Sequence, residues 1–253
     1  YQVLILETAE PAAIRRQVSF CEAVYEGTAT VEGVTAERIY TAKKQAVEEV
    51  LQRGRIPLLV DPDGRSIEVL KPDVVVDAII AKKNLGTYKE MAPLVIGIGP
   101  GFVAGKDVHL VVESMRGHNL ARILETGSAL ANTGIPGNIG GYTKERVIHA
   151  AAEGYMKNLH QIGDVVRKGE KIARIYEQMS PEGVFSGRFV SVEATIPGVL
   201  RGLIREGYHF QKGFKIADID PRESELANCF TISDKASSIG GSVLEAVCRY
   251  VNG

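Results

Sequence analysis

The chain has 253 residues, which is enough for one large domain or two modest ones with a buried core. Its 30 Lys and Arg residues nearly balance its 31 Asp and Glu residues, so a basic nucleic-acid-binding surface is excluded as its main purpose. No apolar stretch reaches the roughly 18 residues of a membrane span, and the three cysteines form no CxxC pair, so we expect a reduced, cytoplasmic compartment and no disulfide framework.

The first 145 residues read as strands that alternate with helices. The chain opens directly on an apolar run at 2–7, as in a parallel strand covered on both faces, and we expect that residues upstream of Tyr1 are missing. A helix is predicted over 42–53, where the apolar residues share one stripe and Gly54 provides the stop. Further buried strands are predicted at 56–61, 73–80, 94–98 and 108–113. This alternation predicts a mainly parallel, Rossmann-like α/β sheet whose first βα unit is missing.

Three alternate glycines, Gly97, Gly99 and Gly101, follow the apolar run at 94–98. They do not form a P-loop, because Asp107 stands where the magnesium-binding Ser or Thr belongs. They do not form a GxGxxG motif either, because Phe102 occupies the third glycine position. Two readings stay open: a tight structural turn, or a loop whose backbone contacts a ligand at the carboxyl end of a strand.

Polar side chains alternate along the next predicted strand. Asp107, His109 and Glu113 fall on one face of a strand, so we predict that they line a pocket with Gly99 and Gly101. The face is open to three readings: a zinc or iron site, a polar catalytic or substrate-binding face, or a plain solvated face. Of these we adopt the catalytic reading without a metal, and it assigns catalytic roles to Asp107, His109, Glu113 and His118.

A possible anion site follows the predicted strand at 73–80. Asp77 lies inside this apolar run, and Lys82 and Lys83 come just after it. Together with Arg116 and the nearby His118, these lysines could hold an anion such as a phosphate, although an ordinary solvated loop is the alternative reading. The glycine-rich segment 132–142 is predicted to be an interdomain linker that can also act as a flap.

An internal repeat occupies the second half of the chain. Residues 151–175 align without a gap on 195–219, and the glycines and both Lys-Gly pairs coincide. Each copy reads as strand, glycine loop, strand, Lys-Gly turn and strand, which predicts a small flattened β barrel-sandwich over 146–222, similar to biotinyl and lipoyl carrier domains. The hairpin between the copies, 176–194, contains no lysine, so we expect neither biotin nor lipoate on this barrel. It is expected to dock a partner, to dimerise, or to close over the α/β site.

The last segment, 223–253, is predicted to return to the α/β domain of residues 1–145, with one long helix over 233–251. Ser233 is a suitable N-cap, and the apolar residues from there to Val251 share one stripe. Gly240 and Gly241 would each cost about 1 kcal/mol relative to Ala in a helix. We therefore expect a close backbone crossing at these glycines.

Several longer motifs recur in a known family. They include "LVDPDG", "KPDVVVDAIIAKKNLGT", "APLVIGIGPGF", "DVHLVVESMRGHNLARIL", "NTGIPG" and "CFTISDKASSIGGSVLEA". Together they resemble the YqeB family, accessory proteins of the selenium-dependent molybdenum hydroxylase system, from Tyr1 to the C-terminal helix. The resemblance implies a Rossmann-like βα unit upstream of Tyr1, and Glu7 then matches the acidic position that could bind a ribose hydroxyl. Cys21 departs from the family pattern, whereas Cys229 agrees with it and is the better thiol candidate, although a buried structural cysteine is the reading we favour.

These observations lead to one principal hypothesis and two alternatives. We expect an accessory or maturation factor for selenium-dependent molybdenum hydroxylases with a nucleotide- or anion-binding α/β site. The alternatives are an NAD(P)-dependent oxidoreductase or nucleotide-using transferase that acts on the molybdenum cofactor, and a docking scaffold without a ligand. The ligand would be NAD(P) or a molybdopterin nucleotide, the partner a molybdenum hydroxylase client or a second copy of the chain. The residues assigned to ligand binding are Glu7, Asp77, Lys82, Gly97, Gly99, Gly101 and Arg116.

Overall fold

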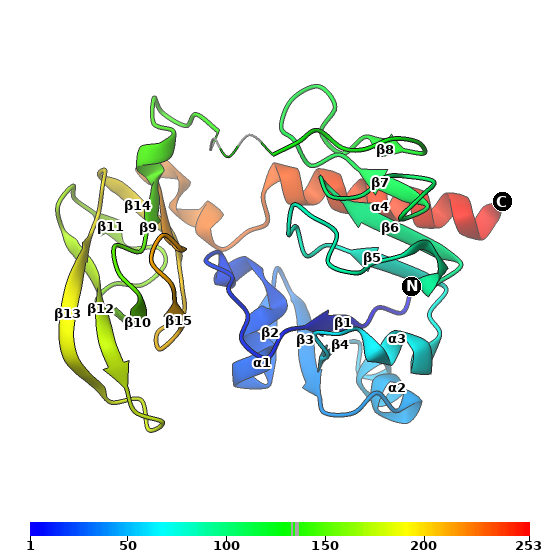
Figure 1. Ribbon diagram of the computed structural model, residues 1–253, viewed down its shortest axis with the longest axis horizontal. Helices are drawn as coiled ribbons and strands as arrows, with labels where there is room; N and C mark the ends of the chain where they lie inside the picture. Colours follow the sequence, from blue (N-terminus) through cyan, green and yellow to red (C-terminus); the bar gives the residue numbers. More distant parts are fainter. Residues whose placement is uncertain (133, 135–136) are drawn as a thin grey trace. The chain divides into compact units, whose positions relative to one another are not determined.

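The structure is a computed structural model that describes residues 1–253 except Thr133, Ile135 and Pro136 (Figure 1). These three lie in the segment 132–142, so its predicted role as a linker and flap falls partly outside the described residues. The chain forms two compact units. Unit 1 comprises Tyr1–Asp63 and Ile135–Thr231, and unit 2 comprises Gly64–Gly134 and Ile232–Gly253. The boundaries of the predicted domains, 1–145, 146–222 and 223–253, differ from the boundaries of these two units.

The first sheet of unit 1 has the strand order β1-β4-β3-β2. Its strands are β1 (Ile5–Glu7), β2 (Thr28–Val31), β3 (Val34–Ile39) and β4 (Ile56–Val60). β1, β4 and β3 run parallel, whereas β2 and β3 form an antiparallel hairpin. The short helices η1 (Arg16–Val18), η2 (Phe20–Glu22) and α1 (Ala23–Glu26) precede β2, and α2 (Lys44–Gln52) connects β3 to β4. The predicted helix at 42–53 is therefore confirmed, and Gly54 follows it with a φ of +69°.

The internal repeat appears in unit 1 as two matching sets of three strands. The first copy gives β10 (Gly154–Asn158), β11 (Val165–Val166) and β12 (Lys171–Met179). The second gives β14 (Gly198–Leu203), β15 (His209–Phe210) and β16 (Lys215–Asp220). The predicted order of strand, loop, strand, turn and strand is thus confirmed in both copies. Gly154 and Gly198 open the copies at equivalent positions, with φ of +152° and +144°, because a Cβ there would collide with a neighbouring strand's carbonyl.

The two copies exchange strands between two antiparallel sheets. One sheet has the order β13-β12-β10-β15 and the other β11-β14-β16-β9, so each takes one short strand from the opposite copy. The remaining strands are β9 (Val147–His149), which follows η4 (Lys144–Arg146), and β13 (Phe185–Glu193), which lies between the copies. Both sheets enclose one apolar core that includes Met156, Ile175, Leu200 and Ile219. The helix η5 (Glu223–Cys229) ends this part, with Cys229 buried in the same core.

Unit 2 is a second α/β sheet with the order β5-β6-β7-β8. Its strands are β5 (Val74–Asp77), β6 (Leu94–Ile98), β7 (Leu110–Val112) and β8 (Ile123–Leu124), and its helices are α3 (Arg65–Leu70), η3 (Lys89–Met91) and α4 (Asp234–Asn252). β5, β6 and β7 are parallel, and β8 pairs antiparallel with β7. The C-terminal helix α4 packs on one face of this sheet, where Ile239, Val243 and Val247 contact the core around Ile96 and Ile98 (Figure 1).

Several predictions about the fold need correction. Residues 1–145 carry two four-stranded sheets rather than one mainly parallel sheet, because the hydrophobic pattern specifies strands but not which strands pair. β5 stops at Asp77, so 78–80 leaves the sheet, and β7 covers only 110–112 of the predicted 108–113. The close backbone crossing predicted at Gly240 and Gly241 is not found among the described residues, where a Cβ at either position would meet nothing within 4 Å. None of the described helices combines the length and apolar composition of a membrane span.

Candidate functional site

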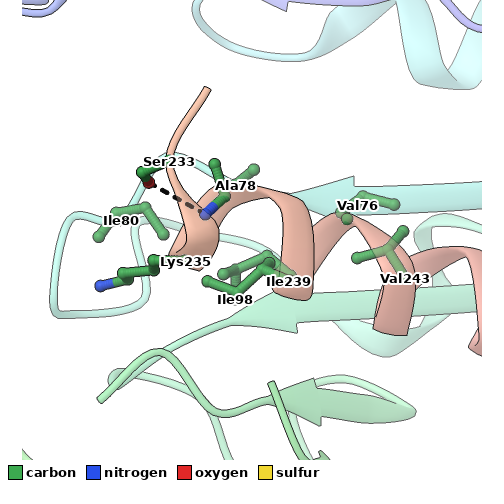
Figure 2. A pocket seen from close by; sticks show the side chains of 10 residues that line it. Val76, Ala78, Ile80, Ile98, Ser233, Lys235, Ile239 and Val243 are labelled. Atoms are coloured by element: carbon green, nitrogen blue, oxygen red, sulfur yellow. Dashed lines mark hydrogen bonds between the residues drawn. The ribbon is translucent and has the colours of Figure 1, made fainter. Parts of the chain in front are cut away.

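The candidate site is a cavity of about 450 Å³ in unit 2, between the carboxyl ends of β5 and β6 and the first half of α4 (Figure 2). Ser233 and Lys235 lie beside Ile80 at the start of the helix, and Val76 and Val243 lie at the other end of the cavity. Most of the wall is apolar. The lining residues are Val76, Ala78, Ile80, Ile98, Ser233, Lys235, Ala236, Ile239, Gly240 and Val243.

The backbone that leaves β5 is strained beside this cavity. Ile80 has a φ of +57° and Lys82 a φ of +63°, and a β-branched residue in this region is a genuine outlier. The buried carboxylate of Asp77 stabilises the loop: it accepts hydrogen bonds from the Ile79 amide at 3.1 Å and from the Thr87 hydroxyl at 2.5 Å. Strain of this kind costs of order 1–3 kcal/mol and gathers at functional sites. The loop thus places Ala78 and Ile80 over the cavity.

Charged groups meet at the start of α4. The Ser233 hydroxyl caps the helix by accepting from the Ala236 amide at 3.2 Å. Arg116 donates both of its terminal nitrogens to Asp234, at 2.7 and 2.8 Å, and this pairing holds the pKa of the Asp234 carboxyl well below its usual range. Burial and the neighbouring Arg116 lower the pKa of Lys235. Lys235 is therefore a partly desolvated cation on the wall of an apolar cavity.

The three alternate glycines are explained by packing within the chain. A Cβ at Gly97 would overlap the ring of Phe102, and one at Gly99 would overlap the side chain of Ser114. Gly101 has a φ of +119°, and its Cβ would lie 2.7 Å from the backbone of Lys83. These contacts support the tight structural turn, with chain atoms occupying the space beside each glycine.

The residues assigned to catalysis point to separate partners. Asp107 accepts from the Val103 amide at 2.9 Å, and His109 Nδ1 accepts from the Val95 amide at 2.9 Å. Burial lowers the pKa of His109, which agrees with a neutral ring that accepts this bond. The Glu113 carboxylate accepts from two backbone amides, those of Met115 at 2.6 Å and Leu130 at 2.7 Å.

These contacts do not bring the predicted polar face together at the glycines. None of Asp107, His109 and Glu113 lines the cavity, and His118 is exposed. Within the part of the chain that the structure describes, no group of three His, Cys, Asp or Glu side chains is placed to hold a metal ion.

The residues assigned to ligand binding are also dispersed. Glu7 belongs to unit 1, where its carboxylate accepts from the adjacent Thr8 amide at 2.8 Å. Asp77 is engaged by its own loop, Arg116 by Asp234, and Lys82 is exposed. The structure thus places Asp77, Lys82 and Arg116 around the elements that form the cavity, but none of the three lines it.

A curated protein of Escherichia coli, named "Uncharacterized protein YqeB", is 47% identical to the chain over 252 residues. The chain belongs to the YqeB family. The alignment covers 100% of the chain but only 44% of that relative, so the chain spans less than half the length of the protein it matches. No family model matches the chain.

Solved structures give only weak likenesses to this YqeB-family chain. A product-bound structure of the ectoine utilization protein EutE (DoeB) from Ruegeria pomeroyi covers 86% of the chain and 84% of its own, with 12% identity and a TM-score of 0.29. A succinylglutamate desuccinylase/aspartoacylase from Rhodobacter sphaeroides gives the same coverage, 14% identity and a TM-score of 0.28. At such scores neither likeness carries an argument about this chain.

Sequence reasoning missed the residues that line the cavity of this YqeB-family chain. Ile98, Ile239 and Val243 have the spacing of ordinary core residues. The sequence therefore gives no sign that they line a cavity. One available signal was Gly240, which interrupts the apolar stripe of a long helix without a turn to justify it.

Proposed function

We propose that the chain is an accessory or maturation factor for selenium-dependent molybdenum hydroxylases, and that its unit 2 cavity binds a nucleotide-like small molecule. The maturation role rests on the family resemblance of the motifs. The ligand-binding role rests on one observation: an apolar cavity of about 450 Å³ at the carboxyl ends of parallel strands, next to Lys235. Small-molecule sites have volumes of this order, and open α/β sheets bind ligands at this edge.

The cavity favours a ligand with a flat apolar part and one anionic group. Ile98 and Ile239 lie next to each other on the cavity wall and offer apolar surface, which suits a base or a similar ring system. The ammonium group of Lys235 would pair with a phosphate or carboxylate at the start of the helix, where the helix dipole also favours negative charge. A dinucleotide such as NAD(P) or a molybdopterin nucleotide meets both requirements.

The lining favours binding over catalysis. Among the described residues that line the cavity, Ser233 and Lys235 are the polar ones, and the Ser233 hydroxyl is engaged as the helix cap. General acid–base catalysis needs a suitable acid and base close together, and the described part of the cavity wall has a lysine but no carboxylate. We therefore rank the accessory role above the oxidoreductase or transferase alternative.

The finer description of the fold is also part of this proposal. We propose that unit 2 and the first sheet of unit 1 are Rossmann-like, and that the repeat forms a barrel-sandwich of the biotinyl/lipoyl type. The barrel would then act as a docking module for a client. The exchanged strands and their single shared core support this description.

A calorimetric titration tests the ligand. NAD(H), NADP(H), ADP and a molybdopterin nucleotide would each be titrated into the wild-type chain, and we expect micromolar binding of at least one. Gly240→Leu should abolish that binding because its side chain enters the cavity. Gly241→Leu is the matched control: Gly241 is adjacent, a Cβ there also meets nothing within 4 Å, and it does not line the cavity. Equal affinities of the two variants, or no binding by the wild type, would overturn the ligand proposal.

A second experiment tests the client. The purified chain would be mixed with a purified selenium-dependent molybdenum hydroxylase, and complex formation would be measured by ultracentrifugation. We expect a complex, whereas a related hydroxylase without selenium should not form one. Absence of a complex would refute the maturation role for this part of the protein, and a complex without any nucleotide binding would favour the docking scaffold.

A further inference from the structure

A second cluster of charged side chains lies in unit 1, on the sheet that contains β14 and β16. Asp218 accepts from Arg146 Nη2 at 3.2 Å and from Arg201, with 3.1 Å to Nε and 2.5 Å to Nη2. Asp220 accepts from Arg222, with 3.0 Å to Nε and 2.9 Å to Nη2. Both carboxylates are about as buried as core residues, with 3% and 2% exposure. Each is therefore fully engaged by guanidinium groups.

Arg15 adds a further cation to this cluster. Its Nη2 donates to the backbone carbonyl of Asn228 at 3.0 Å, and its Nε–H is buried with no acceptor in the part of the chain that the structure describes. Among the residues that the structure describes, Arg15 forms no ion pair. Burial and the positive charge of Arg201 both lower the pKa of Arg15. The guanidinium thus lies in a partly desolvated place beside a like charge.

Arg146 repeats this pattern more deeply in the protein. Its side chain is 4% exposed, and its two terminal nitrogens donate to Asp218 and to the Gly137 carbonyl, both at 3.2 Å. Its Nε–H is also buried without an acceptor among the described residues. Native proteins pair almost all buried polar groups. Arg15 and Arg146 thus bring two such groups to the sheet of β14 and β16, and the Nε–H groups of Arg38 and Arg174 are in the same state elsewhere in the chain.

The charges of the cluster do not balance. Arg15, Arg146, Arg201 and Arg222 contribute four positive charges, Asp218 and Asp220 contribute two negative ones, and Glu225 adds one at 3.7 Å from Arg222. One positive charge therefore remains in a partly buried place, where an unpaired charge is costly. Access from solvent exists, because the side chain of Arg201 is 22% exposed and that of Arg222 is 45% exposed.

We propose that Arg15, together with Arg201 and Arg146, binds a phosphate-class oxyanion in unit 1. Guanidinium groups suit this ligand because their planar forks match tetrahedral oxyanions and keep their charge at any physiological pH. The thiol of Cys229 interacts electrostatically with Arg15 and Arg201, and burial raises its pKa. A bound anion would therefore meet a neutral thiol and not a second negative charge. The ligand is either free phosphate or the phosphate group of a larger ester.

The competing explanation is a purely structural network. The segment around Arg15 is fastened to β14 independently: Leu203 donates to the Ile14 carbonyl at 2.8 Å, and Arg16 Nε donates to the Leu203 carbonyl at 2.9 Å. This attachment does not need Arg15. The structural reading does not account for the excess positive charge beside Asp218 and Asp220, which an oxyanion would neutralise while accepting from the Nε–H groups of Arg15 and Arg146.

Calorimetry with inorganic phosphate tests the proposal on the whole chain. Phosphate and AMP would be titrated in turn at constant ionic strength set by NaCl, and we expect saturable binding of one phosphate per chain. A preference for AMP that Arg15→Gln removes and Lys235→Gln keeps would identify an ester as the ligand of this cluster, whereas equal or better binding of phosphate would identify the free ion. Arg15→Gln should weaken binding by about tenfold or more, as for loss of a charge-assisted hydrogen bond. Arg188→Gln is the control, because Arg188 is 90% exposed and pairs with Glu177 away from the cluster.

The outcomes separate this site from the cavity of unit 2. Lys235→Gln should leave phosphate binding unchanged, because Lys235 belongs to the other compact unit. If Arg15→Gln does not fold, the wild-type melting temperature still decides: phosphate must raise it in a saturable way that NaCl at equal ionic strength does not reproduce. No saturable phosphate effect on the wild type, or the same affinity in Arg15→Gln as in Arg188→Gln, would overturn the proposal.

Discussion

Replacing Gly101 with alanine tests the structural explanation of the glycine turn. At a φ of +119°, alanine is strained, which costs about 1–3 kcal/mol. Its Cβ would also lie 2.7 Å from the backbone of Lys83, and displacing packed backbone costs about another 1–3 kcal/mol. We therefore expect the free energy of unfolding to fall by about 2–6 kcal/mol in Gly101→Ala.

The variant Gly105→Ala separates the cost of backbone strain from the cost of the steric overlap with Lys83. Gly105 has a φ of +79°, and its Cβ would meet no atom closer than the Glu125 carbonyl at 3.6 Å. This variant should lose only the cost of a left-handed alanine, about 1–2 kcal/mol. The difference between the two variants measures the contact between Gly101 and Lys83.

Urea denaturation followed by circular dichroism would give both free energies. Because the two compact units need not unfold together, hydrogen exchange of the amides in β6 would report unit 2 separately. Equal losses in Gly101→Ala and Gly105→Ala would refute the reasoning, since the close backbone approach would then cost nothing. Faster exchange over 78–87 in Gly101→Ala alone would show that the displaced backbone is that of Lys83.

Three further predictions follow from the structure. Gly240→Ala should raise the stability of unit 2 by about 1 kcal/mol, because a Cβ there meets nothing and alanine favours the helix; a fall in its melting temperature would contradict this. Asp218→Asn should lower the free energy of unfolding in urea by about 3–5 kcal/mol, because two guanidinium groups lose a buried counter-charge. A decrease no larger than that of a substitution at an exposed position would contradict this. The folded-state pKa of Asp234 is depressed by Arg116, so its contribution to stability is present above about pH 4 and is lost as the pH falls. Melting curves of wild type and Asp234→Asn should therefore differ at neutral pH and converge in acid; a constant difference would contradict the assignment.

The amino-acid sequence by itself determined the elements whose signals are local. The repeat offset placed the strands of both copies, because equivalent Lys-Gly turns connect the second strand of each copy to its third. The helix α4 was predicted within one residue at each end, because Ser233 caps it and its apolar residues recur with helical spacing. The buried run at 94–98 matched β6 at both ends. Cap chemistry, turn glycines and periodicity depend on neighbours in the chain, so they can be read without the fold.

The pairing of strands and the fate of polar side chains were decided only by the tertiary structure. A strand's hydrophobic pattern does not name its partner, which is why one predicted sheet became two. His109 and Glu113 have side chains suited to catalysis, yet each accepts from a backbone amide that lies far away in sequence, those of Val95 and Leu130. The cavity joins residues near 76–98 to residues of α4 that are far apart in sequence. Long-range packing depends on the balance of many weak contacts, and no local pattern in the chain records that balance.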